Sequence, residues 1–210
     1  VGTRSCLPIL VEGLKRLEYR GYDSAGVAIQ QNGVLKVVKA AGKIRELERR
    51  LGPQPPAGTA GIAHTRWATH GEPNDTNAHP HVDSNGHLAL VHNGIIENYL
   101  VLKAALEAEG HRFRTQTDTE VLAHLVEKYL KKGLNLERAV GEALRQVEGT
   151  YGIAVMYDGE PGTVVGARKG SPLVVGIGDG EYFAASDASA APVGSPRWSR
   201  TRESRSCAMA

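Results

Sequence analysis

Histidines are concentrated in one short part of the chain. Six of the eight lie between His64 and Asn98, at positions 64, 70, 79, 81, 87 and 92. The spacing His79-x-His81 could present two imidazoles on one face of an extended segment, an arrangement that binds zinc. No acidic or cysteine partner stands at a recognisable metal spacing. Hydrogen-bonded structural histidines are therefore the favoured interpretation and no metal is expected. A metal-dependent hydrolase using the His64–His92 cluster is the alternative.

A second group of polar residues lies within the segment 64–71. The guanidinium of Arg66 can form bidentate hydrogen bonds to a carboxylate. Trp67 would supply an apolar wall, while Thr69 and His70 would supply short polar contacts. This set suits recognition of a small amino acid, although a surface arginine stacked on a tryptophan would use the same residues.

Asn93 and Gly94 follow the apolar run 88–91. An asparagine amide and a glycine N–H that are adjacent at a strand end can form an oxyanion hole. Glycine also lets the backbone approach a ligand closely. A plain Asn-Gly turn is the alternative. Asp118 stands where a helix is predicted to begin, so it could hold a ligand ammonium or belong to the helix cap.

No nucleophile accompanies these binding groups. Cys6 lies at the start of the first predicted helix, ahead of an apolar stripe, and is interpreted as a small structural residue. Cys207 lies close to the C-terminus, in a segment of different composition. A G-x-S-x-G elbow, a P-loop and a GxGxxG motif are all missing from the sequence.

The first half of the chain must position these residues on short helices and strands. Leucines at three- and four-residue steps predict the first helix, and Asn32-Gly33 predicts a tight hairpin turn. A long polar loop is predicted over 68–84. The predicted elements are a helix over 5–19, strands near 25–30 and 34–39, a helix over 44–51, and strands at 61–64 and 88–91.

The second half predicts three helices followed by four short strands. Thr117 and Glu120 are spaced as a capping box, and Asn135 is placed to cap the third helix. The predicted helices lie between 96 and 110, 117 and 133, and 135 and 149; the strands cover 151–157, 163–168, 172–177 and 181–186. Helices and strands in separate blocks indicate an α+β fold rather than alternating βαβ units.

Charge and hydropathy exclude two classes of protein. The 210 residues carry a net charge of +2. Four arginines and one glutamate give residues 188–210 a charge of +3, which leaves −1 for residues 1–187 and no basic face for nucleic acid. No apolar run approaches ~18 residues, so a membrane-spanning helix is not expected. Two cysteines at opposite ends fit a reducing cytosol, and a cytoplasmic location is expected.

Residues 188–210 differ in composition from the rest of the chain. Ser, Ala, Arg and Pro dominate them, immediately after a predicted strand. We expect a disordered basic tail, or an aberrant one translated out of frame from GC-rich coding sequence. The folded domain would then comprise residues 1–187.

Several long motifs occur in an order that resembles one enzyme family. They are the segments 17–26, 64–72, 77–81, 92–98 and 117–120. Over residues 1 to about 187 the chain resembles the glutaminase domain of the glutamine–fructose-6-phosphate aminotransferase (glucosamine-6-phosphate synthase) family. His-Asn-Gly and Arg-Trp-Ala-Thr-His-Gly are motifs of class II amidotransferases in general, whereas Tyr-Arg-Gly-Tyr-Asp-Ser and Ala-His-Pro-His favour this family.

The resemblance implies a four-layer αββα sandwich of the N-terminal-nucleophile hydrolase type. The family hydrolyses L-glutamine to glutamate and ammonia without a cofactor. Ammonia then passes to a sugar-isomerase domain that makes glucosamine 6-phosphate from fructose 6-phosphate. A homodimer is also implied, with no nucleic-acid or membrane partner.

The resemblance also implies a role for each candidate residue. By matching position, Arg66 would bind the glutamine α-carboxylate and Asp118 its α-ammonium. Asn93 and the N–H of Gly94 would form the oxyanion hole. Arg20 would lie near the nucleophile. The pocket would be lined by Trp67, Thr69, His70 and Gly94.

The family's nucleophile is a cysteine that opens the chain and whose own α-amino group serves as the base. Motif register places this cysteine before Val1, together with most of the first, central strand, and the sugar-isomerase domain is also absent from these residues. We therefore expect an amidotransferase as the parent protein and no activity from these 210 residues alone. A non-catalytic glutamine-binding fragment and the metal-dependent hydrolase are the alternatives.

Overall fold

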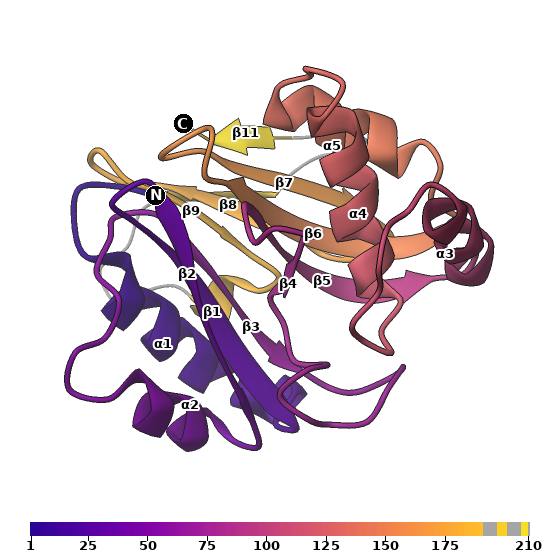
Figure 1. The fold of residues 1–210 in the computed structure, drawn as a ribbon. Coiled ribbons are helices and arrows are strands. Elements are labelled where there is room, and N and C mark those ends of the chain that lie inside the picture. The colour runs from indigo at the N-terminus through magenta and orange to yellow at the C-terminus, as the bar shows by residue number, and fades with distance from the viewer. Residues whose placement is uncertain (191–196, 201–206, 210) are drawn as a thin grey trace.

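Helices and sheets form four layers in the computed structural model, which describes residues 1–190 and the backbone of 197–200 and 207–209 (Figure 1). Helices α1 (Cys6–Leu17) and α2 (Ile44–Leu51) cover the outer face of one sheet. Helices α3 (Tyr99–Ala108), α4 (Thr119–Leu130) and α5 (Leu136–Leu144) cover the outer face of a second sheet. The inner faces of the two sheets pack against each other, which gives the αββα order that the sequence predicts.

The first sheet has the strand order β2-β1-β3 and is antiparallel throughout. Its strands are β1 (Ser24–Gln31), β2 (Val34–Ala41) and β3 (Gly61–Arg66). The hairpin predicted from Asn32-Gly33 is confirmed, since both residues have positive φ and Gln31 pairs with Val34. Side chains alternate along β1 as the pleat requires: Val27 and Ile29 face the helices, and Ala28 faces the other sheet.

The second sheet has the order β11-β7-β6-β5-β4. Its strands are β4 (His81–Val82), β5 (Leu88–Ile96), β6 (Gly149–Tyr157), β7 (Val164–Lys169) and β11 (Cys207–Met209). The prediction that β5 ends at Val91 is wrong. The antiparallel ladder with β6 continues through Asn93 and Gly94 to Ile96, because each residue of this stretch has a partner between Gly149 and Ile153.

The sequence predicts N-terminal caps for two helices, α4 and α5. The cap predicted for α5 is confirmed, because the Asn135 side chain accepts a hydrogen bond from the Arg138 N–H at 3.1 Å. The capping box predicted for α4 is wrong. Asp118 occupies the N-cap position, and Glu120 instead accepts the backbone N–H groups of Arg114 and Thr115, each at 2.8 Å. Glu120 therefore anchors the loop that precedes the helix.

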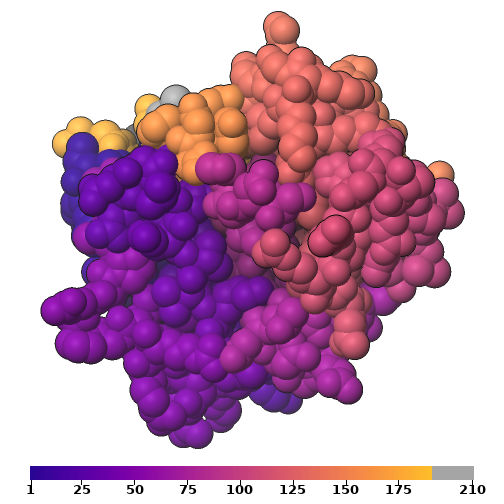
Figure 2. All heavy atoms as spheres, in the orientation of Figure 1, coloured from indigo at the N-terminus to yellow at the C-terminus, as the bar shows by residue number. Residues whose placement is uncertain are grey.

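The long polar loop after β3 is packed against the sheets. Asn77, His79 and His81 are buried, and the Asn77 amide donates to the Glu72 carbonyl at 3.0 Å. A Cβ atom on Gly26 of β1 would lie 2.2 Å from the His79 carbonyl oxygen, so the loop crosses directly over this strand. In Figure 2 the indigo and violet N-terminal region lies on the left, the pink to salmon helical layer lies on the right, and magenta residues lie between them.

The last part of the chain adds a third, small sheet of order β10-β8-β9. Its strands are β8 (Val174–Ile177), β9 (Tyr182–Ala185) and β10 (Arg197–Arg200). Two short 3-10 helices, η1 (Glu18–Arg20) and η2 (Ala188–Ala190), complete the elements.

The segment 188–210, for which the sequence predicts a disordered or aberrant tail, contains η2, β10 and β11. Residues 191–196, 201–206 and 210 lie outside the described residues, and the origin of the segment stays a prediction. Among the helices that the structure describes, none has the length and apolar character needed to cross a membrane.

Candidate functional site

A cavity of about 320 Å³ lies between the two large sheets. Its walls come from α1, β3, β5, β6, β9 and the start of α4. The cavity brings together the candidate residues that the sequence identifies, with the exception of His70: Arg20, Arg66, Trp67, Thr69, Asn93, Gly94 and Asp118. The His70 ring instead packs edge-on against Tyr99, at 5.3 Å between ring centroids.

Arg66 is the last residue of β3 and is buried. Its guanidinium donates to the backbone carbonyls of residues 70–72, at 3.4 Å to Gly71 and 3.5 Å to Glu72. No carboxylate of a described residue lies within ion-pairing distance of Arg66. Burial lowers the pKa of Arg66, and Asp23 and Asp118 oppose that shift, but arginine stays protonated at neutral pH. A fixed positive charge thus faces the cavity.

The alternative of an arginine stacked on a surface tryptophan is wrong. Trp67 is 63% exposed and packs against Tyr22, with 5.6 Å between their ring centroids, whereas Arg66 is buried. The loop that carries Trp67 is held by Asp23, whose side chain accepts the Ala68 N–H. Sequence reasoning missed Asp23, although it lies inside the segment 17–26.

Asp118 occupies the N-cap position of α4, but its side chain makes no capping hydrogen bond. Its Oδ2 atom accepts the backbone N–H of Ile96, at 2.8 Å, in a buried contact. The carboxylate therefore ties the start of α4 to the end of β5. It also places a negative charge on the wall of the same cavity that Arg66 lines.

Asn93 and Gly94 lie within β5, where Asn93 pairs with Gly152 and Gly94 with Tyr151. Gly94 has a φ of 145°, and a Cβ atom there would lie 2.1 Å from the Thr150 carbonyl oxygen. Only glycine fits this position. An amide side chain and a backbone N–H thus stand side by side on the cavity wall, as an oxyanion hole requires.

Four histidines form a buried layer beside these strands. The rings of His64 and His79 stack with centroids 4.5 Å apart, and those of His79 and His81 are 4.7 Å apart. His79 Nδ1 accepts the His92 backbone N–H at 3.2 Å. Burial lowers the pKa of His64 and of His81 to about 3, so both are neutral at physiological pH. His79, His81 and His92 are hydrogen-bonded, as structural histidines would be, whereas His64 Nδ1 finds no partner among the described residues.

Threonines at the start of α4 complete this layer and were missed by sequence reasoning. His92 Nδ1 lies 2.9 Å from Thr119 Oγ1, and His81 Nε2 lies 3.0 Å from Thr117 Oγ1. Both threonines flank Asp118, so the histidines join the loop, β5 and α4 around the candidate carboxylate. The signal for them was Thr117-Asp118-Thr119-Glu120, a motif in which Thr117 was assigned only to a capping box and Thr119 had no role.

A group of side chains with metal-binding spacing lies elsewhere. In the part of the chain that the structure describes, His111, His124 and Glu127 present ligand atoms within 4.8 Å of one another. None of these residues lines the cavity. The His64–His92 cluster of the sequence alternative does not include them.

Comparison with known proteins indicates the family to which this chain belongs. A family model described as "Glutamine amidotransferase domain" matches residues 64–191, a stretch that contains most of the candidate residues. The chain belongs to this glutamine amidotransferase family. The match is to the segment that runs from the end of β3, through β5 and the helical layer, to β9.

Curated relatives of this amidotransferase domain are longer proteins. Glutamine–fructose-6-phosphate aminotransferase (isomerizing) from Methanothermobacter thermautotrophicus is 56% identical over 183 residues, which cover 87% of this chain. The enzyme of the same name from Chlorobaculum tepidum is 56% identical over 193 residues, or 90% of this chain. The chain spans 31% of the length of each.

Solved structures give the same picture of the fold. Glutamine phosphoribosylpyrophosphate amidotransferase from B. subtilis, complexed with ADP and GMP, superposes with a TM-score of 0.85 at 28% identity. The match covers 99% of this chain and 45% of that one. The predicted fold is confirmed as an α+β sandwich of the N-terminal-nucleophile hydrolase type.

Proposed function

We propose that the cavity binds L-glutamine and that the parent protein hydrolyses it to glutamate and ammonia. One observation carries the proposal: the positive charge of Arg66 and the negative charge of Asp118 line the same cavity. A free amino acid carries the opposite pair, a carboxylate and an ammonium. Membership of the glutamine amidotransferase family supports glutamine as that amino acid.

In this proposal each candidate residue has a stated role. Arg66 binds the α-carboxylate and Asp118 binds the α-ammonium. The side-chain amide of Asn93 and the N–H of Gly94 stabilise the oxyanion that forms at the glutamine side-chain carbonyl. Trp67 and Thr69 line the pocket, and Arg20 borders the reacting thiol of the parent protein. His70, which packs against Tyr99, makes no contact with glutamine in this proposal.

The names of the relatives support a larger reaction for the parent protein. We propose that it transfers the released ammonia to fructose 6-phosphate, in a sugar-isomerase domain, to give glucosamine 6-phosphate. A homodimer located in the cytoplasm is part of the same proposal.

Covalent catalysis needs a thiolate beside the oxyanion hole. Cys6 is buried among Leu7, Val11 and Leu14, outside the cavity wall, and burial raises the pKa of its thiol. It therefore suits a structural role rather than nucleophilic attack. We propose that these 210 residues, tested alone, bind glutamine without turning it over.

Calorimetric titration with L-glutamine tests the binding site. The Arg66→Ala variant should lose at least about 30-fold in affinity, because a buried charge-assisted contact is removed. Arg45→Ala, at an exposed position on α2, is the matched control and should bind like the unmodified chain. Equal affinity in all three folded proteins would contradict the assigned role of Arg66. Glutaminase turnover that Asn93→Ala abolishes would contradict the proposed lack of activity.

A further inference from the structure

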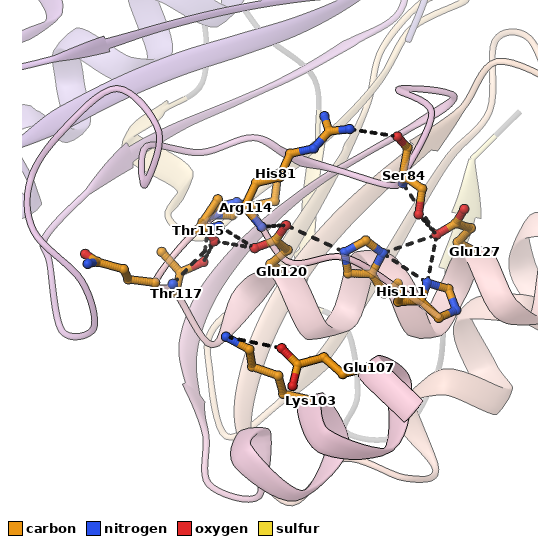
Figure 3. A network of polar contacts seen from close by, with 12 residues as sticks. His81, Ser84, Lys103, Glu107, His111, Arg114, Thr115, Thr117, Glu120 and Glu127 are labelled. Atoms are coloured by element: carbon orange, nitrogen blue, oxygen red, sulfur yellow. Dashed lines mark hydrogen bonds and ion pairs between the residues drawn. The ribbon is translucent and has the colours of Figure 1, made fainter. Parts of the chain in front are cut away.

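The helical layer contains a second polar cluster, formed by His111, His124 and Glu127, none of which lines the cavity (Figure 3). His111 follows the end of α3, directly after Gly110. His124 and Glu127 lie one helical turn apart on α4, so their side chains leave the same face of that helix. The three side chains converge although they come from two separate elements.

The ligand atoms of this cluster form a nearly equilateral triangle. His111 Nδ1 and His124 Nδ1 are 3.3 Å apart, and each lies 3.2 Å from Glu127 Oε2. With zinc–nitrogen bonds of about 2.0–2.1 Å, the ligand atoms on one face of a tetrahedral site lie about 3.3–3.4 Å apart. The triangle therefore matches one face of a tetrahedral zinc site.

We propose that His111, His124 and Glu127 bind a zinc ion through His111 Nδ1, His124 Nδ1 and Glu127 Oε2. The ion would link the residue after α3 to the middle of α4. A fourth position remains for water or a small ligand, as in zinc sites with three protein ligands.

The surroundings of His124 supply a second, independent observation. Its side chain is only 2% exposed, yet among the described residues its Nε2 atom finds no hydrogen-bond partner. The nearest carboxylate oxygen, Glu120 Oε1, lies 3.6 Å away. A metal on Nδ1 requires the proton to be on Nε2, where it would face this carboxylate. Carboxylates behind ligating histidines orient them in known metal sites, and Glu120 is itself fixed by two backbone N–H groups.

The environment of Glu127 also fits a cation. Its side chain is 3% exposed, and its Oε2 atom faces both histidines and accepts the Ser84 hydroxyl at 2.8 Å. Its other oxygen, Oε1, pairs with the ammonium of Lys131 at 2.6 Å. Lys131 opposes a metal, because its positive charge lies next to the proposed ion. Its removal should therefore strengthen binding.

Equilibrium dialysis of the metal-stripped protein against Zn²⁺ alone tests the proposal. The unmodified chain should bind one ion, and Co²⁺ in its place should give the visible absorption of tetrahedral coordination. His111→Gln should weaken binding at least about 10-fold, with circular dichroism confirming that the variant is folded. Lys131→Met should bind more tightly than the unmodified chain.

An exposed histidine outside the cluster provides the control. His87, whose side chain is 59% exposed and pairs with Asp158, should be replaceable by glutamine with no change in Zn²⁺ affinity. Zn²⁺ should also raise the melting temperature of the unmodified chain and not that of His111→Gln. Failure to bind one Zn²⁺ per chain would overturn the proposal. Binding that His111→Gln leaves unchanged would also overturn it, because the ion would then lie elsewhere.

Discussion

At the scale of single residues, the candidate site depends on side chains whose chemistry is evident in the sequence and whose surroundings are not. Arg66 and Asp118 are recognisable as partners for a zwitterion, but their burial becomes visible only in the fold. Gly94 shows most clearly that the surroundings of a residue come from the fold. Its neighbour Thr150 lies far along the chain and comes from β6, and it is this carbonyl that excludes any side chain.

Substitution of Gly94 by alanine should be costly for this reason. The positive φ and the contact with the Thr150 carbonyl together predict a loss of about 2–4 kcal/mol in the free energy of unfolding. Gly86→Ala is the matched control. Gly86 has a φ of 79°, but a Cβ atom there would have no neighbour within 4 Å, so only the backbone strain of about 1 kcal/mol should appear.

Urea unfolding followed by circular dichroism measures both free energies. The two variants share a positive φ and differ in the neighbouring carbonyl, so their difference reports the steric contact with Thr150. Equal losses in the two variants would contradict the steric explanation. Glutamine affinity should fall in Gly94→Ala and stay unchanged in Gly86→Ala.

At the scale of elements, the hairpin turn and the cap of α5 form as local spacing predicts, whereas the end of β5 and the start of α4 do not. The Asn32-Gly33 turn and the Asn135 cap use groups within a few residues of each other. The end of β5 depends instead on a ladder with β6, about 60 residues later in the chain. Likewise, Glu120 has the spacing of a capping box but bonds to the preceding loop.

Glu120 is therefore expected to stabilise the junction between that loop and α4. Glu120→Ala leaves the part-buried N–H groups of Arg114 and Thr115 without their acceptor and should cost about 2–4 kcal/mol. Glu137→Ala, in the exposed first turn of α5, is the matched control for an acidic residue near a helix N-terminus. It should cost at most about 1 kcal/mol. Chemical denaturation measures both, and equal costs would argue against the anchoring role.

At the scale of the whole molecule, the buried histidine layer makes stability depend on pH. Burial lowers the pKa of His64 and His81 from 6.5 to about 3, and that of His79 falls well below its usual value. Between about pH 3 and pH 6.5 the unfolded chain therefore binds more protons than the folded chain. Stability should therefore be complete above pH 6.5 and decline as the pH falls towards about 3.

Other groups also have shifted pKa values, and Glu127 and His124 are two whose effects the measurement must separate. The pKa of Glu127 is held at about 2: burial by itself would raise it, but Lys131, His124 and Ser84 outweigh burial. The contribution of the Glu127 carboxylate to the free energy of unfolding is lost only as the pH falls below 4.5. Desolvation by itself would lower the pKa of His124, but Glu120 and Glu127 outweigh it and raise that pKa. Protonation of His124 on acidification therefore stabilises the folded chain. The net decline between pH 6.5 and about 5 thus reports the buried neutral histidines.

Urea midpoints between about pH 5 and 7 check this prediction. The unmodified chain should lose stability steadily as the pH is lowered through that range. His81→Gln, whose amide can still meet Thr117 Oγ1, should show a shallower decline. If the urea midpoint of the unmodified chain did not change with pH over this range, the buried histidines would not be neutral in the folded state.

The sequence by itself determined the family resemblance, the α+β class and the residue types that suit an amino acid. It could do so because motifs, turns and helix caps are encoded by residues close together in the chain. Cys6 was also interpreted as a structural residue from the apolar stripe beside it, and its burial agrees.

Only the tertiary structure decided which of these groups meet. It brought Arg66 and Asp118 to one cavity, gave Gly94 its carbonyl neighbour, and placed His111 beside His124 and Glu127. The histidine spacing in the sequence had directed attention to His79 and His81 instead, which pack against each other and hydrogen-bond to neighbouring segments. The physical reason is that burial and contact between distant segments depend on how the layers pack, which short-range spacing does not encode.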